Sequence, residues 1–237
     1  MKKLSFSSLI LFENDDYLLV NKPPLLSSLE DRAEPWNLQR LAIEYCPESQ
    51  LAHRLDKETS GVLAVAKNPE AYRSLTIQFE QREVKKIYHA LVKGIYDFKD
   101  EVIDLPIKKL SVGAVKIDKR EGKAASTIIS TILTYRGYTL LECKPVSGRM
   151  HQIRIHLSAT GMPIISDHLY HGDDIYLSSL KPKYNLKKWT EELPLIKRVA
   201  LHATKLEFKG LSGEQIDAEA PYPKDFEVLI KQLDKYS

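Results

Sequence analysis

The chain has 237 residues, of which 43% are hydrophobic and 28% charged. This composition is typical of a globular protein with one large domain or two small lobes, and it excludes disordered, collagenous and fibrous chains. The formal net charge of +3 neither requires nor excludes a nucleic-acid partner, because a basic cleft can exist on a nearly neutral protein. No apolar run reaches the length of a membrane span, and two cysteines cannot form a disulfide framework. We therefore expect a cytoplasmic protein without a membrane partner.

The first third of the chain contains clear local signals. Short apolar runs separated by a polar turn predict a β-hairpin over residues 8–20. An amphipathic pattern predicts a helix over residues 37–45, and a continuous apolar run predicts a buried strand over residues 62–66. Asn68 and Pro69 are typical of the N-cap and first position of a further helix. The core face of that helix comprises Ala71, Leu75 and Phe79.

Strand patterns dominate the remainder of the chain. Residues 86–92 alternate as a strand, and the clearest later strands cover 127–133 and 138–143. A polar, insertion-like stretch over 171–198 precedes a strand over 199–208. Hairpins are too frequent for a regular βαβ repeat, so we expect an α+β fold.

Residues 148–160 are ambiguous. Ile153, Ile155 and Leu157 alternate as in a strand, but residues 161–163 (Gly-Met-Pro) are a strong helix-stop signal. We therefore predict a helix over this segment.

The first segment whose side chains could take part in catalysis is centred on Asp56. His53 and Arg54 precede this carboxylate, and residues 59–61 (Thr-Ser-Gly) follow it. An aspartate in this setting can be a nucleophile, a base or half of a structural ion pair, and the segment alone favours the ion pair.

The second segment has two arginines and two histidines within residues 148–157. The histidines are five residues apart, which is poor zinc spacing on a helix, so we expect no metal site. Positive charge near a helix start favours a phosphate or carboxylate partner. The chain has no glycine-rich phosphate loop and no G-x-S-x-G segment, which argues against kinases, dehydrogenases and serine hydrolases, and we expect no cofactor.

Six segments in chain order resemble the motifs of one family, the pseudouridine synthases of the RluA type. Two of them are similar to HRLDxxTSG and GRxHQIRxHL, and six matches in order are very specific. The six segments are residues 19–23, 53–61, 86–94, 148–157, 200–208 and 220–226. The resemblance thus covers nearly the whole chain.

The resemblance implies a mixed, mostly antiparallel central sheet with flanking helices and two lobes around an RNA-binding cleft. It also implies a single catalytic domain over residues 1–237, with no room for an S4-like RNA-binding domain before Leu9. We expect a monomer that acts on structured RNA, either tRNA or rRNA. The target uridine, and the role of the 171–198 insertion, do not follow from the resemblance.

The resemblance also implies roles for individual residues. Asp56 would be the reacting carboxylate, Tyr88 the active-site aromatic residue, and Arg154 the cation paired with the aspartate. Arg54 would help to displace the target uridine, and Leu201 would form an apolar wall of the pocket. The RNA-binding and base-flipping set is Arg54, Arg149, His53 and Leu201. His53 has the alternative of a supporting hydrogen-bonding role.

The chain departs from the family pattern at a few positions. Leu25 and Ser166 stand where the family commonly has glycine, Met162 replaces a common histidine, and residues 27–30 differ from the usual segment. These differences concern the shape of RNA-contacting loops and leave the catalytic set intact.

Pseudouridine formation suits a site without cofactors, because the base is detached, turned and reattached to the same sugar. The carboxylate can attack the sugar carbon or remove a sugar proton, and the sequence leaves both routes open. A non-catalytic RNA-binding protein is one alternative. A glycosidase is another, but it needs two catalytic acids and the signature holds one.

Basic clusters extend the candidate RNA surface, although solvated surface is the usual explanation for such clusters. The best of them interleaves basic and aromatic residues, as single-stranded RNA surfaces do. It comprises Lys181, Lys183, Tyr184, Lys187, Lys188 and Trp189.

Overall fold

The computed structural model describes residues 5–30, 36–111, 113–186 and 190–236. The chain forms two compact units. Unit 1 comprises Met1–Tyr88 and His202–Pro221, and unit 2 comprises His89–Leu201 and Tyr222–Ser237.

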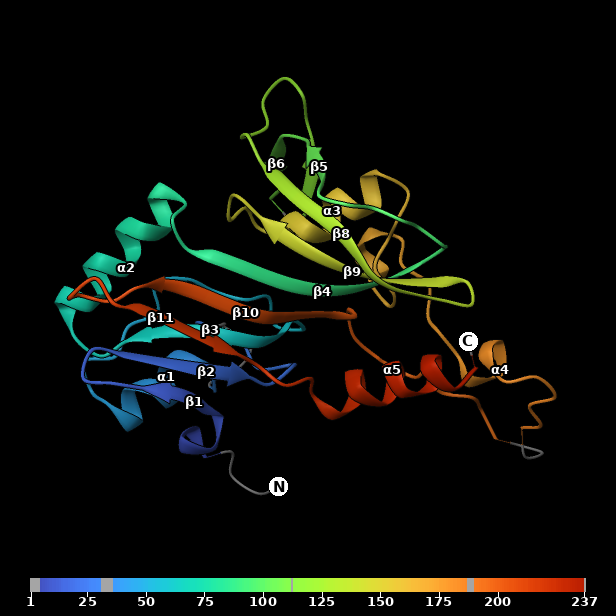
Figure 1. Ribbon diagram of the computed structural model, residues 1–237, viewed down its shortest axis with the longest axis horizontal. Coiled ribbons are helices and arrows are strands. Elements are labelled where there is room, and N and C mark those ends of the chain that lie inside the picture. The colour runs from blue at the N-terminus through green and yellow to red at the C-terminus, as the bar shows by residue number, and fades with distance from the viewer. Residues whose placement is uncertain (1–4, 31–35, 112, 187–189, 237) are drawn as a thin grey trace. The chain divides into compact units, whose positions relative to one another are not determined.

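Unit 1 is built on a sheet in which β1, β2, β3 and β10 are neighbours in that order, with β11 paired to β10 (Figure 1). These strands are β1 (Ile10–Glu13), β2 (Tyr17–Lys22), β3 (Ser60–Ala66), β10 (Leu201–Lys209) and β11 (Gln215–Glu219). The pairs are antiparallel except β3 with β10, which is parallel. The predicted hairpin near the N-terminus and the predicted strand over 62–66 are confirmed.

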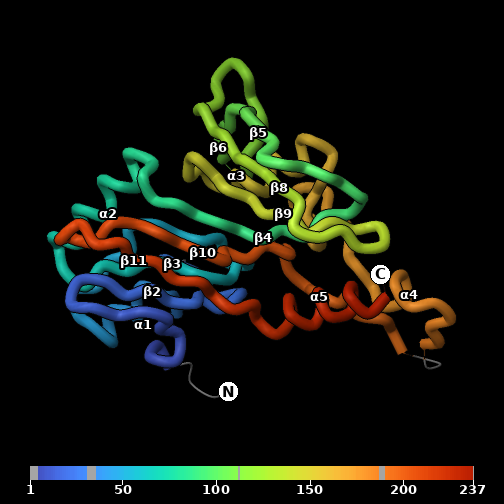
Figure 2. Tube along the Cα trace, viewed as in Figure 1, coloured from blue at the N-terminus to red at the C-terminus, as the bar shows by residue number. Residues whose placement is uncertain are grey.

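The two α-helices of unit 1 match the helices predicted there, including the predicted N-cap Asn68, whereas a short 3-10 helix was not predicted. The helices are the 3-10 helix η1 (Phe6–Leu9) and the α-helices α1 (Leu38–Tyr45) and α2 (Pro69–Gln81). The side chains of Asn37 and Asn68 accept hydrogen bonds from the N–H groups of Arg40 and Ala71, which satisfies donors that a helix start leaves unpaired. Figure 2 traces the chain from β3 through α2 into β4 (Lys85–Lys93), and the boundary between the units falls within β4, after Tyr88.

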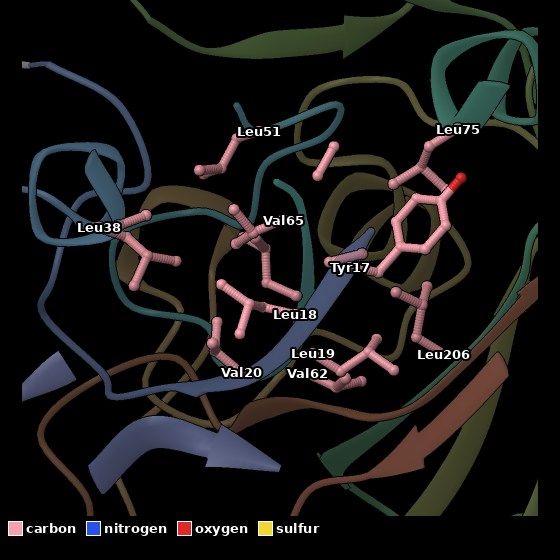
Figure 3. Close-up of a cluster of buried hydrophobic side chains, with 14 of the residues drawn as sticks. Tyr17, Leu18, Leu19, Val20, Leu38, Leu51, Val62, Val65, Leu75 and Leu206 are labelled. Atoms are coloured by element: carbon pink, nitrogen blue, oxygen red, sulfur yellow. The ribbon is translucent and has the colours of Figure 1, made fainter. Parts of the chain in front are cut away.

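The core of unit 1 is a cluster of large apolar side chains from β2, β3 and the two α-helices (Figure 3). Complete burial of each leucine or valine contributes about 1.5–3 kcal/mol, so this cluster supplies the main driving force for folding of the unit. Its labelled members are Tyr17, Leu18, Leu19, Val20, Leu38, Leu51, Val62, Val65, Leu75 and Leu206.

Unit 2 contains an antiparallel sheet with β8 between β5 and β9, and a separate hairpin of β6 and β7 (Figure 1). The strands are β5 (Glu101–Asp104), β6 (Ile107–Lys109), β7 (Val115–Ile117), β8 (Ser126–Tyr135) and β9 (Tyr138–Pro145). The helices are α3 (Gln152–Ala159), η2 (His168–Tyr170), α4 (Leu177–Leu180) and α5 (Lys224–Tyr236). The second half of β4 also belongs to unit 2, where Leu91 exchanges backbone hydrogen bonds with Ile165 and Ala200.

The mixed, mostly antiparallel sheet with helices is confirmed, with two differences in detail. The helix predicted within 148–160 begins only at Gln152, because His151 has a left-handed backbone (φ +51°) and the residues before it form a turn. Helix α5 had no counterpart among the predicted elements, although Phe226, Leu229 and Leu233 are buried along one face of it.

Two of the positions that depart from the family pattern have a glycine-like backbone. Leu25 has φ +64° and Ser166 has φ +59°. The left-handed conformation costs non-glycine residues roughly 1–2 kcal/mol. Leu25 is 60% exposed, and its N–H donates to the carbonyl of Lys57 at 2.8 Å. Backbone bonding, rather than side-chain burial, therefore holds Leu25 in this conformation.

A comparison of glycine with alanine at position 25 isolates this backbone cost. We expect Leu25→Gly to be more stable than Leu25→Ala by about 1 kcal/mol in urea denaturation, since only glycine adopts positive φ at no cost. At Leu29, which is exposed and has no positive φ, we expect the reverse order, with the alanine variant at least as stable. Equal stabilities of the two position-25 variants would contradict the explanation.

Candidate active site

Asp56 lies in a tight connection that leads into β3. Its carbonyl accepts a hydrogen bond from the N–H of Thr59 at 3.1 Å, which closes a turn immediately before the strand. The Asp56 side chain is half-buried, whereas Arg54, two residues earlier, is exposed. The segment therefore presents a carboxylate and an exposed cation close together in the sequence.

A buried ammonium group holds this connection in place. Lys22 is fully buried, and its Nζ donates to the carbonyls of Pro23, Leu26 and Lys57 at 3.1, 2.8 and 3.2 Å. A buried charge is tolerated only when it is hydrogen-bonded in this way. The lysine of the 19–23 motif thus links that motif to the residue that follows Asp56.

Residues 25–28 bind the same connection from both sides of Asp56. The N–H of Leu25 donates to the carbonyl of Lys57 at 2.8 Å. On the other side, the hydroxyl of Ser28 donates to the carbonyl of Leu55 at 2.8 Å and accepts from the N–H of Leu55 at 3.1 Å. The backbone is thus anchored immediately before and immediately after Asp56.

The glycine of the Thr-Ser-Gly sequence permits close approach of β3 and β10. Gly61 has φ +115°, and a Cβ at this position would lie 2.1 Å from the carbonyl oxygen of Ala203. Beside it, the Ser60 hydroxyl lies 2.9 Å from Nδ1 of buried His202, whose Nε2 lies 3.0 Å from the Ala220 carbonyl oxygen. Since a carbonyl only accepts, Nε2 carries a proton, and in the neutral imidazole Nδ1 accepts from the Ser60 hydroxyl.

Tyr88 is the second predicted site residue in unit 1. Its side chain is half-buried. Burial raises the pKa of its hydroxyl, and the negative charge of Asp56 raises that pKa further. The hydroxyl therefore remains protonated, and the carboxylate and the tyrosine share one electrostatic environment.

His53 is engaged by the fold. Its Nε2 accepts the N–H of Ala64 at 2.9 Å, and its ring lies 4.5 Å from that of Phe79, at 30° to it. Burial, together with the positive charge of Lys86, lowers the pKa of His53 to about 3. These contacts suit the supporting role considered for His53, and its role in RNA binding stays a prediction.

Arg154 is the central charged residue of the site segment in unit 2. On α3, it binds Asp167 through two parallel hydrogen bonds, Nε to Oδ2 and Nη2 to Oδ1, each 2.7 Å long. Its guanidinium carbon also lies 5.1 Å from the ring centroid of Tyr170. Asp56 belongs to unit 1, so its predicted pairing with Arg154 stays a prediction.

Asp167 was not identified from the sequence, although one signal was present. It follows the apolar residues Ile164 and Ile165, and an acid in such a segment needs a cationic partner if it is buried. The structure shows this burial, since Asp167 is 1% exposed.

The other polar residues of the 148–157 segment tie α3 to the sheet. The Gln152 amide donates to the Ser126 carbonyl at 2.9 Å and to the Thr127 hydroxyl at 3.0 Å. His156 is fully buried between Thr127 and the Leu105 carbonyl. The prediction that the charge of Arg149 lies at the helix start is wrong. Arg149 is exposed and lies before the helix, which begins at Gln152.

Leu201 is buried at the first position of β10, and an ion pair organises the backbone around it. Arg198, 2% exposed, binds Asp225 through Nε and Nη2 at 2.7 and 3.0 Å. Its Nη1 donates to the carbonyls of Val199 and Leu201 at 3.1 and 3.2 Å. The position of Leu201 is therefore coupled to the start of α5.

The structure describes part of the basic cluster in the 171–198 insertion. The Nζ of Lys181 lies 6.0 Å from the ring centroid of Tyr184. Lys187, Lys188 and Trp189 lie outside the described residues. Among the described residues, no group of histidine, cysteine or acidic side chains is arranged to hold a metal ion. No helix in these parts of the chain has the length and apolarity needed to cross a membrane.

Replacement of the buried ammonium tests its structural role. We expect Lys22→Met to lower the free energy of unfolding by about 2–4 kcal/mol, because three carbonyls lose a charged donor. The control is Lys85→Met, which removes a lysine whose side chain is 74% exposed and should change stability by less than about 0.5 kcal/mol. Similar losses in the two variants would be inconsistent with a special role for Lys22.

The low pKa of His53 predicts a specific pH dependence of stability. Between its folded pKa of about 3 and the ordinary value of 6.5, the unfolded chain binds a proton that the folded protein does not, so stability falls with pH. Between about pH 7.5 and about pH 5, this group should account for a loss of about 2 kcal/mol. Urea denaturation of His53→Gln, whose amide oxygen can still accept the Ala64 N–H, should show a correspondingly smaller loss. An unchanged pH dependence in this variant would refute the assignment.

Comparisons with known proteins support the predicted family. A family model described as RNA pseudouridylate synthase matches residues 16–159. The ribosomal large subunit pseudouridine synthase D of Xanthomonas campestris is 35% identical over 234 residues, which cover 94% of this chain and 69% of that protein. The protein of the same name from Neisseria meningitidis serogroup A is 34% identical and covers 94% of this chain, which in turn spans only 60% of that relative's length.

A solved structure also matches. It is that of human RNA pseudouridylate synthase domain containing 1, with a TM-score of 0.69 and 27% identity, covering 94% of this chain and 87% of the human one. The resemblance inferred from the six motifs is confirmed, and with it the enzyme class. The chain belongs to the RluA-type family of RNA pseudouridine synthases, which are isomerases.

Proposed function

We propose that this chain converts uridine to pseudouridine in the RNA of the large ribosomal subunit, with Asp56 as the reacting carboxylate. Family membership supports the reaction, and the names of the Xanthomonas and Neisseria relatives support the substrate. The observation that carries the role of Asp56 is the anchoring of its backbone on both sides, at Leu55 and Lys57. A cytoplasmic location is part of the proposal because it follows from this substrate.

The reaction is an isomerisation. The bond from N1 of uracil to C1′ of the ribose breaks, the base turns, and a bond from C5 to C1′ forms while the hydrogen on C5 is lost and N1 gains one. Asp56 can assist by attack on C1′ or by removal of a sugar proton. Each route requires a carboxylate held at a defined position, and the hydrogen bonds around Asp56 supply this rigidity.

The remaining site residues receive roles within the same proposal. Tyr88, with its protonated hydroxyl, offers a flat face against which the displaced uracil can stack. Arg54 is exposed, and it enters the space that the displaced base leaves, which offsets part of the cost of unstacking. Arg154 pairs with the reacting carboxylate and orients it. Leu201 lines the uracil pocket, and Arg149 binds the RNA backbone.

Replacement of the carboxylate tests the proposal. We expect Asp56→Asn to lower the rate of pseudouridine formation by about 10³-fold or more, since the amide keeps the shape but loses the charge. The measurement is pseudouridine content, by mass spectrometry, of large-subunit rRNA transcripts incubated with each protein. Asp15→Asn, at an exposed turn of unit 1, should leave the rate unchanged.

Three outcomes would contradict parts of this proposal. Full activity of Asp56→Asn would exclude the assigned carboxylate. Activity of the unmodified protein on tRNA transcripts, but not on large-subunit rRNA, would exclude the proposed substrate. RNA binding without pseudouridine formation on either RNA would favour the non-catalytic RNA-binding alternative.

A further inference from the structure

One short turn supplies two groups that contact Arg154 within unit 2. The carbonyl of Asp167 accepts hydrogen bonds from the N–H groups of Tyr170 and Gly172 at 3.0 and 2.8 Å. A Cβ on Gly172 would lie 1.9 Å from the carbonyl oxygen of Ile164, so the turn requires glycine there. The compact turn brings the carboxylate to the edge of the guanidinium and the tyrosine ring to its face.

These two contacts restrain the guanidinium in different ways. The paired hydrogen bonds that Arg154 donates to Asp167 fix the guanidinium in its own plane. The Tyr170 ring restrains tilting out of that plane, and the pair is desolvated, since Arg154 is 8% and Tyr170 5% exposed. Asp167 engages two of the five N–H donors of Arg154, so the orientation of the other three depends on both contacts.

The hydroxyl of the same tyrosine makes a second connection. It accepts the N–H of Val115 in β7 at 3.0 Å and lies 2.8 Å from Nδ1 of His151. The hydroxyl thus contacts both a backbone group of β7 and the residue that precedes α3. Tyr170 also packs in an apolar cluster with Ile107 and Val115, one residue from each strand of hairpin β6–β7.

Hairpin β6–β7 and the turn after it are strongly basic. Residues 107–123 contain six basic and two acidic side chains. The basic ones are Lys108, Lys109, Lys116, Lys119, Arg120 and Lys123, and the acidic ones are Asp118 and Glu121. Lys108 pairs with Glu121 and Lys116 with Asp118, which leaves an excess of positive charge suited to RNA phosphates.

We propose that Tyr170 is a positioning residue whose ring and hydroxyl have separate roles. Its ring aligns the Arg154 guanidinium, and its hydroxyl sets the place of the basic hairpin β6–β7 with respect to that guanidinium. RNA phosphates bound by the hairpin are thereby held in register with Arg154. The consequence for catalysis rests on the proposed function of Arg154, whereas the alignment itself is a property of unit 2.

Two substitutions distinguish the role of the Tyr170 ring from the role of its hydroxyl. Tyr170→Phe keeps the ring and removes the hydroxyl, whereas Tyr170→Leu removes both. Tyr176→Phe removes another tyrosine hydroxyl from unit 2 and is the matched control. Steady-state kinetics on the rRNA transcript and hydrogen exchange of arginine Nε–H groups by NMR are measured for all proteins. The Arg154 signal is assigned by its loss in Arg154→Lys.

In Tyr170→Leu we expect exchange of the Arg154 Nε–H to be about tenfold faster and kcat about tenfold lower. The Nε–H of Arg198, which binds Asp225 in the same two-bond geometry, is an internal reference and should change less than twofold. In Tyr170→Phe we expect unchanged kcat and Arg154 exchange, but a KM for RNA raised about threefold or more. Tyr176→Phe should match the unmodified protein.

Each part of the inference has a result that would overturn it. Unchanged exchange at Arg154 in Tyr170→Leu, or equal acceleration at Arg198, would refute alignment by the ring. An unchanged KM in Tyr170→Phe would refute placement of the hairpin by the hydroxyl. If the unmodified protein forms no pseudouridine, the proposed function fails, and the exchange rates still decide the alignment.

Discussion

The buried ammonium of Lys22 is the constraint on which the order of the Asp56 segment depends. Residues 23–26 contain two prolines, which have no backbone N–H to donate, so this turn has few amide donors of its own. The ammonium instead gathers carbonyls from the turn and from Lys57, residues that are distant in sequence. Because a buried charge without these partners would be prohibitively unfavourable, the turn and the Asp56 connection must fold together.

Unit 2 uses the same physical principle with arginine. Arg154 and Arg198 are both buried, and each is matched by an aspartate through two parallel hydrogen bonds. Such pairs have a strong directional preference, although they add little net stability after desolvation. Their value lies in orientation: one holds the guanidinium of the site helix, and the other holds the start of β10, where Leu201 lies. Both units therefore present site residues from frameworks of satisfied buried charge.

The backbone at Leu25 shows how tertiary bonding overrides local preference. A leucine in the left-handed region is unfavourable by itself, yet the hydrogen bond from its N–H to Lys57 maintains the conformation. Ser166 is similar, with its hydroxyl donating to the Ile196 carbonyl at 3.0 Å. At both positions a hydrogen bond to another segment accompanies a left-handed backbone in a residue other than glycine.

The sequence by itself determined the elements that depend on neighbouring residues, together with the motifs that identify the family. The caps at Asn37 and Asn68 and the N-terminal hairpin follow from local hydrogen bonding and apolar periodicity. Only the tertiary structure decided that Arg154 binds Asp167 in unit 2 and that Lys22 closes the Asp56 connection. These partners are 13 and 35 residues apart, and no periodicity or capping rule acts over such separations. Buried charges select partners by proximity in space, and that proximity exists only once the chain has folded.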